Sequence, residues 1–96
     1  MNFCSQITPG EENDGLGICT VQIFGIPPWG YETTILDAVG LHPVERYRTS
    51  AEARAGHARW VEASKGLVTV IELGSTDGLV PGRDVNLQRV PSPQAQ

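Results

Sequence analysis

The sequence has few cysteines, few aromatic residues and no long apolar run, and each absence excludes a class of protein. Of its 96 residues, 6% are aromatic, and the two cysteines, Cys4 and Cys19, lie outside any CxxC motif. No stretch approaches the roughly 18 apolar residues of a membrane-spanning helix. Residues 1–6 hold no Lys or Arg, so no signal peptide is predicted. We therefore expect reduced, structural thiols in a protein made inside the cell, with a Cys4–Cys19 disulfide as the alternative.

The chain is acidic overall but contains a locally basic segment. Seven basic residues against eleven acidic ones give a net charge of −4, which disfavours a general affinity for the phosphate backbone of nucleic acids. Residues 45–65 differ, because their five basic and three acidic residues balance to +2 and leave −6 for the rest. An apolar fraction of 40%, before the 11 glycines are added, is ordinary for a folded domain with one hydrophobic core.

One segment in the middle of the chain has the clearest helix signals. Thr49 and Glu52 fit a capping box, in which each side chain binds the backbone N–H of the other residue, so a helix is predicted to begin at Ser50. Gly66 in the left-handed conformation is predicted to end it, with Lys65 near the negative end of the helix dipole. A stripe at spacings of three and four is predicted to face a sheet: Ala53, Gly56, His57, Trp60, Val61 and Ser64.

Two members of this stripe have predicted structural roles. Glycine inside a helix costs up to ~1 kcal/mol relative to alanine, and a close approach of Gly56 to a strand beneath it offsets that cost. His57 is predicted to be buried and to hydrogen-bond a strand or loop carbonyl, because the spacing of the two cysteines and two histidines matches no zinc pattern. A Cys19 nucleophile activated by His57 or His42 is a weaker alternative, since a cysteine in a strand is usually packed.

Several segments around this helix have the β-branched and alternating residues of strands. They are residues 18–26, 31–39, 44–48, 67–73 and 84–90. Pro27 and Pro28 end the first, which is predicted to form a hairpin with the second. Residues 40–43 are predicted to break the pattern, and residues 67–73, apolar on both faces, to lie in the middle of the sheet. The predicted fold class is α+β: a single helix packed on one face of a mainly antiparallel sheet of four to six strands, in the order β-β-β-α-β-β.

The two ends of the chain complete one small domain that spans residues 1–96. Residues 1–16 are predicted to form an N-terminal arm and an acidic loop from Glu11 to Asp14, although residues 1–7 fit a short strand equally well. Residues 91–96 are predicted to form a polar tail that blunts a sheet edge.

The sequence contains no recognisable motif for catalysis or for a cofactor. The string GLG at residues 15–17 begins a GxGxx pattern, but it precedes a strand, whereas the dinucleotide fingerprint follows one. Carboxylate pairs such as Glu32 with Asp37 or Glu45 are predicted to lie on the solvated surface. We therefore expect no enzyme activity, no metal and no cofactor.

Two groups of residues are candidates for an interaction surface. The first is a set of arginines near Tyr47 and Trp60 that can hold phosphates with stacking help, or that forms a solvated helix face: Arg46, Arg48, Arg54 and Arg59. The second is the turn around Trp29 and Tyr31, where an exposed Trp and Tyr would anchor a protein partner unless Trp29 folds back over the core.

Residues 31–61 resemble a family of small proteins from tailed bacteriophages. The shared pattern YET...RYxTxxEAxxGH corresponds to residues Tyr31-Glu32-Thr33, Arg46-Tyr47-Arg48-Thr49 and Glu52-Ala53-Arg54-Ala55-Gly56-His57 of this chain. The resemblance covers about a third of the sequence and brings no established activity with it.

The resemblance implies a phage protein, and the remaining features predict how it works. We expect a non-enzymatic protein that acts through protein-protein contacts, first as a small component of the virion or its assembly. One alternative is a phage factor that inhibits a host enzyme or defence complex, and another is a nucleic-acid-binding accessory protein. The expected partners are a phage or host protein, or a second copy of the chain in a homo-oligomer, with nucleic acid ranked lower and no membrane. The expected location is the host cytoplasm at synthesis, and the virion for a particle component.

Overall fold

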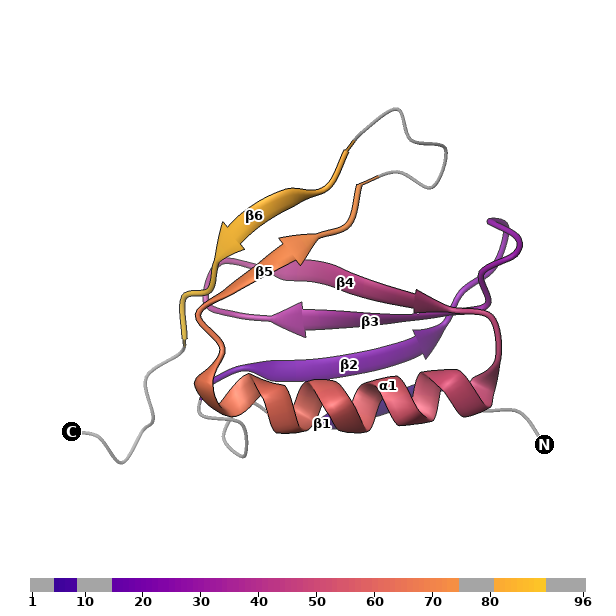
Figure 1. Cartoon of the computed structure of the whole chain (residues 1–96), viewed down its shortest axis with the longest axis horizontal. Coiled ribbons are helices and arrows are strands. Elements are labelled where there is room, and N and C mark those ends of the chain that lie inside the picture. Colours follow the sequence, from indigo (N-terminus) through magenta and orange to yellow (C-terminus); the bar gives the residue numbers. More distant parts are fainter. Residues whose placement is uncertain (1–4, 9–14, 75–80, 90–96) are drawn as a thin grey trace.

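The computed structural model describes residues 5–8, 15–74 and 81–89 (Figure 1). Its elements are β1 (Ser5–Thr8), β2 (Gly17–Gln22), β3 (Tyr31–Leu36), β4 (Leu41–Tyr47), α1 (Ser50–Ala63), η2 (Ser64–Gly66), β5 (Thr69–Glu72) and β6 (Arg83–Asn86). The predicted α+β class and the order β-β-β-α-β-β are confirmed, and β1 precedes that order as a further short strand. The predicted acidic loop, the predicted polar tail and the first residues of the predicted arm lie outside the described residues.

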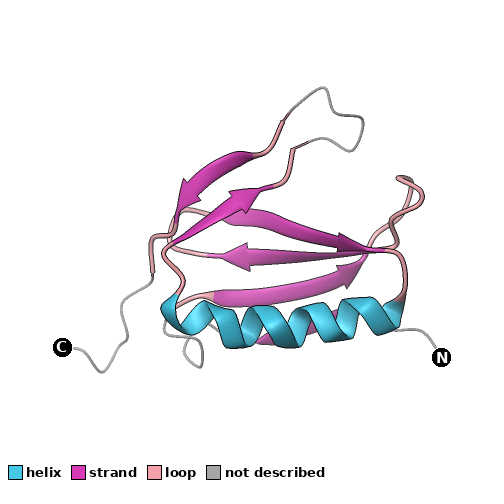
Figure 2. Cartoon of the chain, viewed as in Figure 1, coloured by secondary structure: helices cyan, strands magenta, loops and turns pink. Residues whose placement is uncertain are grey.

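The described strands form two antiparallel sheets. One sheet has the order β1-β2-β3-β4, and the other contains β5 and β6. Figure 2 shows α1 lying along one face of the larger sheet, with the smaller sheet beyond β4. The predicted hairpin of β2 and β3 is confirmed, but β2 ends at Gln22, earlier than the predicted residue 26. The chain turns away there and passes through Gly25, whose φ of 83° is left-handed and incompatible with a continuing strand.

The prediction that residues 67–73 lie in the middle of the sheet is wrong. β5 pairs with β6 alone within the described part of the chain, and its two faces differ in burial. Val70 is 6% exposed, whereas the neighbouring Ile71 is 62% exposed. One apolar face of β5 therefore covers the core while the other remains open. The backbone N–H of Leu73 donates to the Pro43 carbonyl at 2.8 Å and joins the smaller sheet to β4.

The predicted break at residues 40–43 is confirmed at Gly40, which lies in the turn between β3 and β4, but is wrong at residues 41–43, because β4 runs from Leu41 through Pro43. Proline has no N–H to donate to a ladder and is tolerated at sheet edges and at bulges. Both conditions are met here. β4 is the outer strand of the larger sheet, and its register against β3 shifts between Thr33 and Thr34.

This bulge decides which β4 residues lie on the same face of the sheet. Ile35 pairs with His42 and Thr33 pairs with Glu45, and directly paired residues of antiparallel strands share a face. Since Thr33 and Ile35 are two positions apart on β3, His42 and Glu45 share that face too, although they are an odd number of positions apart. Tyr47 follows Glu45 on this face and packs against α1.

The helix begins and packs as predicted. The Thr49 hydroxyl accepts from the Glu52 N–H at 3.1 Å, and the Glu52 carboxylate accepts from the Thr49 N–H at 3.2 Å, which confirms the capping box. The predicted stripe faces the sheet. Its buried members are Ala53, Gly56, His57 and Ser64, and Trp60 and Val61 are partly buried.

Gly56 allows α1 to lie close to β4. A Cβ atom at this position would overlap the ring and hydroxyl of Tyr47, which is 5% exposed. The predicted close approach is therefore confirmed, and the group that fills the space is an aromatic side chain rather than strand backbone.

The helix ends differently from the prediction. α1 stops at Ala63 and tightens into the 3-10 turn η2, and Gly66 does not adopt the left-handed conformation. The Arg89 guanidinium donates to the carbonyls of Ser64 and Leu67 at 2.6 and 2.7 Å. An arginine from the segment after β6 therefore holds the carbonyls at the helix end, and Lys65 lies in the last turn as predicted.

The main core lies between α1, the larger sheet and β5. Its buried apolar residues are Leu16, Ile18, Ile35, Val44 and Val70, and the residues packed against them are Trp60, Val61, Leu67, Val85 and Leu87. A smaller cluster forms near the start of α1, where Tyr47 and Ala53 are buried and Tyr31 packs against them. None of the helical segments in the described ranges is long and apolar enough to cross a membrane.

Candidate functional site

A pocket of about 320 Å³ opens beside the first turns of α1. Its walls are Trp29, Glu45, Arg46, Tyr47, Arg48, Glu52, Ala55 and Arg59. The predicted interaction residues therefore divide into two sets. Those that line the pocket are Trp29, Arg46, Arg48 and Arg59, whereas Tyr31 packs on the smaller cluster and Arg54 is exposed elsewhere on the helix.

Trp29 and Arg48 form one wall of the pocket as a stacked pair. The guanidinium carbon of Arg48 lies 5.6 Å from the centroid of the Trp29 ring, within range of a cation–π interaction. Trp29 is partly exposed and belongs to neither buried apolar cluster. The ring is therefore neither fully exposed nor part of the core, and its two predicted roles both stay predictions.

Glu45 joins β4 to the helix beside this wall. Its Oε1 atom accepts hydrogen bonds from the Tyr47 hydroxyl and from the Trp60 indole N–H, both at 2.9 Å. The Arg59 guanidinium lies 3.5 Å from the same atom. Glu45 is 34% exposed at its side chain, so the prediction of a merely solvated carboxylate is wrong. Its carboxylate instead holds the Tyr47 and Trp60 side chains through two short hydrogen bonds, with Arg59 at a longer distance.

A buried chain of hydrogen bonds leads from Glu45 to the helix. The Tyr47 hydroxyl lies 2.9 Å from the Thr33 hydroxyl, which in turn lies 2.6 Å from the Thr20 hydroxyl. Thr20 is 2.7 Å from Nδ1 of His57 on the buried side of α1. Thr20 and Thr33 are directly paired across β2 and β3, so the strand register brings their hydroxyls together. The chain thus crosses the larger sheet beneath the helix.

Which group donates in each of these hydrogen bonds follows from counting the hydroxyl protons. Each hydroxyl has one proton, and the Tyr47 proton goes to the Glu45 carboxylate, so Tyr47 accepts from Thr33 and Thr33 accepts from Thr20. Thr20 must then accept from His57, which places a proton on Nδ1 of that ring. Burial lowers the pKa of His57, which keeps the imidazole neutral. The predicted burial of His57 is confirmed, and Nδ1 of its ring bonds a threonine hydroxyl.

The same contacts explain the ionisation of the tyrosine. The pKa of Tyr47 is raised to about 12, mainly by burial; the Thr33 hydrogen bond opposes this increase and the nearby Glu45 carboxylate adds to it. The phenol therefore remains a hydrogen-bond donor throughout the physiological range.

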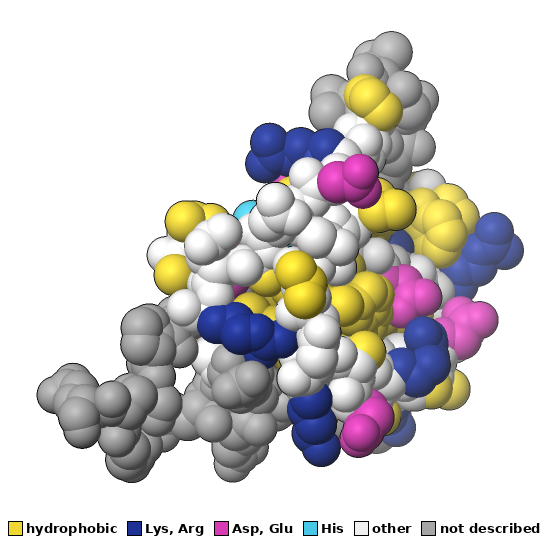
Figure 3. Space-filling model, turned by 60° about the vertical axis from the view of Figure 1, so that its left-hand side comes forward, with side chains coloured by type: hydrophobic (Ala, Val, Ile, Leu, Met, Phe, Trp, Pro, Cys, Tyr) yellow, Lys and Arg dark blue, Asp and Glu magenta, His cyan; other side chains and the backbone are white. Residues whose placement is uncertain are grey.

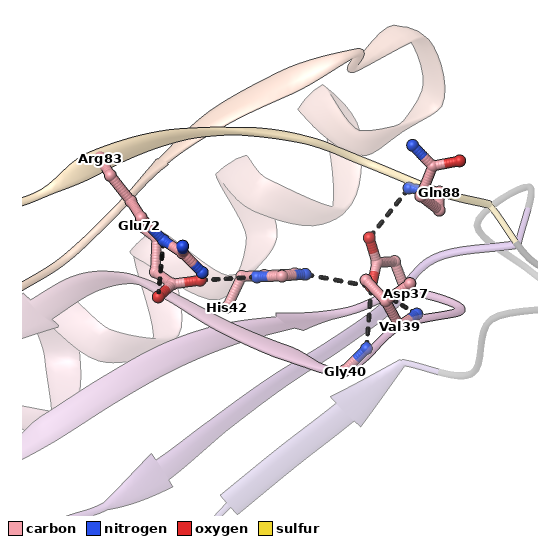
Figure 4. A network of polar contacts seen from close by, with 7 residues as sticks. All are labelled: Asp37, Val39, Gly40, His42, Glu72, Arg83 and Gln88. Atoms are coloured by element: carbon pink, nitrogen blue, oxygen red, sulfur yellow. Dashed lines mark hydrogen bonds and ion pairs between the residues drawn. The ribbon is translucent and has the colours of Figure 1, made fainter.

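A second polar network, shown in Figure 4, surrounds His42 at the far end of β4. Its Nδ1 lies 2.7 Å from Glu72 and its Nε2 lies 3.0 Å from Asp37, and Arg83 lies 3.5 Å from Glu72. Two carboxylates facing one imidazole favour its charged form, in which both ring nitrogens donate. The hydrogen bond to Glu72 raises the pKa of His42, burial opposes it, and Asp37 adds to the increase. The bond from His42 lowers the pKa of Glu72, with a further contribution from Arg83.

The prediction that Asp37 is solvated is wrong, because its side chain is 0% exposed. Its carboxylate accepts from the backbone N–H groups of Val39, Gly40 and Gln88 at 3.0, 3.1 and 2.9 Å. Burial alone would raise the pKa of Asp37, but these bonds and the one from His42 lower it. Asp37 and His42 therefore join the turn between β3 and β4 to β5 and to the segment after β6.

Sequence reasoning missed this network for a simple reason. His42 and Glu72 are 30 positions apart, and no spacing rule connects residues of two different sheets. A partial signal was present, because Asp37 followed three positions later by Gly40 is typical of a turn in which the Asp side chain binds the backbone.

Within residues 5–8, 15–74 and 81–89, no cluster of three or more His, Cys, Asp or Glu residues could hold a metal ion. Cys19 is a free thiol whose pKa is raised by burial, and its predicted alternative pairing with Cys4 lies outside the described residues. Figure 3 shows exposed apolar side chains among the basic and acidic ones on one side of the molecule.

Comparison of the chain with models of protein families, with curated proteins and with solved structures found no match. The resemblance of residues 31–61 to small phage proteins therefore stays a prediction.

Proposed function

We propose that this protein catalyses no reaction and acts through protein-protein contacts, as a small component of a phage particle or of its assembly. The observation that supports contact formation is the pocket beside α1, where the exposed Arg48 guanidinium lies over the partly exposed Trp29 ring. Tryptophan and arginine contribute more binding energy to protein interfaces than most residue types. The phage setting rests on the resemblance of residues 31–61 alone.

The acidic groups of the pocket favour binding over turnover. Glu52 is held by the backbone N–H groups of Arg48 and Thr49, and Glu45 is held by Tyr47 and its neighbours. A general acid or base must exchange its proton with a substrate, whereas these carboxylates are fixed by donors of the protein itself. They keep the walls in place, as a preformed binding surface requires.

The proposal is tested by capture from cells infected with the phage that encodes the protein, together with mass spectrometry of purified virions. We expect a phage head or tail protein to be captured by the wild type and lost when Trp29→Ala is combined with Arg48→Ala. The matched control is Arg54→Ala, which removes an exposed arginine outside the pocket and should retain the partner.

Two outcomes would overturn the proposal. The first is a protein that is absent from virions and captures no phage protein. The second is a stoichiometric host enzyme or defence complex as the captured partner, which would assign the protein to host inhibition instead.

A further inference from the structure

Some of the charged groups that line the pocket already have hydrogen-bond partners within the protein. Arg46 is 16% exposed at its side chain, and its Nε donates to Glu32 at 2.9 Å. Glu52 accepts from two backbone N–H groups at the start of α1. The Thr49 hydroxyl caps the same helix end, so the helix terminus is not left open as an anion site. These groups form the frame of the pocket.

Two arginines remain available to a ligand. The guanidinium of Arg48 stacks on Trp29 and makes no hydrogen bond or ion pair with any side chain in the described part of the chain. Arg59 is 62% exposed, and its 3.5 Å contacts with Glu45 are at the outer limit of a hydrogen bond. The Glu45 oxygen already has two shorter donors in Tyr47 and Trp60, so Arg59 can turn to a ligand without leaving that carboxylate unpaired.

We propose that this pocket binds the carboxylate of an acidic side chain in a peptide segment of a partner protein, held by Arg48 and Arg59 with a neighbouring apolar side chain against Trp29. Arginine presents paired N–H donors that match the geometry of a carboxylate, and a guanidinium already stacked on an aromatic ring loses little freedom on binding. This inference deepens the proposed function, because it names the chemistry of the partner at that surface.

Carboxylate fits the pocket better than the phosphate backbone of a nucleic acid. A volume of about 320 Å³ accommodates one or two side chains, whereas single-stranded nucleic acids are tracked by extended grooves. The whole chain has a net charge of −4, which repels a long polyanion more strongly than it repels one acidic residue flanked by apolar ones.

The test is an NMR titration of the ¹⁵N-labelled full chain with blocked peptides. The probe is Ac-Gly-Glu-Phe-Glu-Gly-NH₂, and its isosteric control replaces both glutamates with glutamine. We expect the acidic peptide to shift the Trp29 indole signal and the backbone amides of Arg48 and Ala55. The glutamine peptide should bind at least about tenfold more weakly, because it forms no charge-assisted hydrogen bonds. Arg48→Gln and Arg59→Gln should each weaken binding by about tenfold, and Arg54→Gln should leave it unchanged.

Equal affinity of the acidic and glutamine peptides, or shifts confined to residues outside the pocket, would overturn the inference. So would preferential binding of hexathymidylate over the acidic peptide at the same ionic strength, which would assign the arginines to nucleic acid. If the peptides fail while the Trp29→Ala and Arg48→Ala double variant still loses its captured partner, the inference fails and the proposed function stands. If the acidic peptide binds but the wild-type protein is absent from virions and captures no phage protein, the carboxylate site stands and the proposed function fails.

Discussion

Replacing Gly56 by alanine has two opposite effects on stability, one from helix propensity and one from steric overlap. Alanine is preferred over glycine within a helix by about 1 kcal/mol, so propensity alone predicts a more stable protein. The new methyl group would overlap the Tyr47 ring, and forcing an extra carbon into a packed site costs about 1–3 kcal/mol. The ring can move aside only by weakening its hydrogen bonds to Thr33 and Glu45, which contribute about 1 kcal/mol each. We therefore expect Gly56→Ala to lower the free energy of unfolding by about 2 kcal/mol.

Urea denaturation followed by far-ultraviolet circular dichroism measures this change. The control is Gly66→Ala, because a Cβ atom there meets nothing within 4 Å and the backbone is not left-handed. Its stability should match the wild type within about 0.5 kcal/mol or exceed it slightly. In a Tyr47→Leu background the ring is absent, so Gly56→Ala should no longer be destabilising. A Gly56→Ala protein as stable as the wild type would refute the close packing of α1 on Tyr47.

Three further substitutions test other contacts. Thr20→Val keeps the shape of the side chain but interrupts the buried hydrogen bonds between Tyr47 and His57, so the free energy of unfolding should fall by about 1–3 kcal/mol. A loss below about 0.5 kcal/mol would contradict this series of hydrogen bonds. His42→Gln removes a group whose pKa is raised on folding. Its stabilising effect is full below the unfolded pKa of about 6.5 and is lost as the pH rises through the folded pKa. The stability difference between wild type and His42→Gln should therefore shrink from pH 5.5 to 8.5, and a constant difference would count against a charged His42. Arg89→Gln should accelerate amide hydrogen exchange around Ser64 by about tenfold. Unchanged exchange there would contradict a stabilising role of Arg89 at the end of the helix.

Signals that depend on neighbouring residues were readable from the sequence. The capping box of Thr49 and Glu52 involves positions within one helical turn, and the stripe that includes Gly56 and His57 follows from helical periodicity. The structure confirms both. The α+β class followed from the same reasoning, because one amphipathic helix can be covered only by the strands around it.

Features that depend on register or on distant partners could not be read in this way. The apolar pattern of residues 67–73 does not show that one face of β5 is left open. Pro43 argues against a strand until the bulge against Thr33 and Thr34 is known. The same bulge brings Glu45 onto the face that carries Thr33. The arginines and Trp29 were therefore predicted as an interaction surface, but the position of the Glu45 carboxylate between them could not be predicted.

The most direct test of this description is the protonation of the His57 ring, because its hydrogen bond ends the chain that Glu45 begins. Nitrogen-15 NMR of the histidine ring at neutral pH measures which nitrogen carries the proton. We expect a neutral imidazole protonated at Nδ1. In Thr20→Val the chemical shift of Nδ1 should differ from that of the wild type, because its hydrogen-bond acceptor is removed. A proton on Nε2 alone, or a charged ring at neutral pH, would contradict the hydrogen-bond chain that joins the buried side of α1 to the pocket.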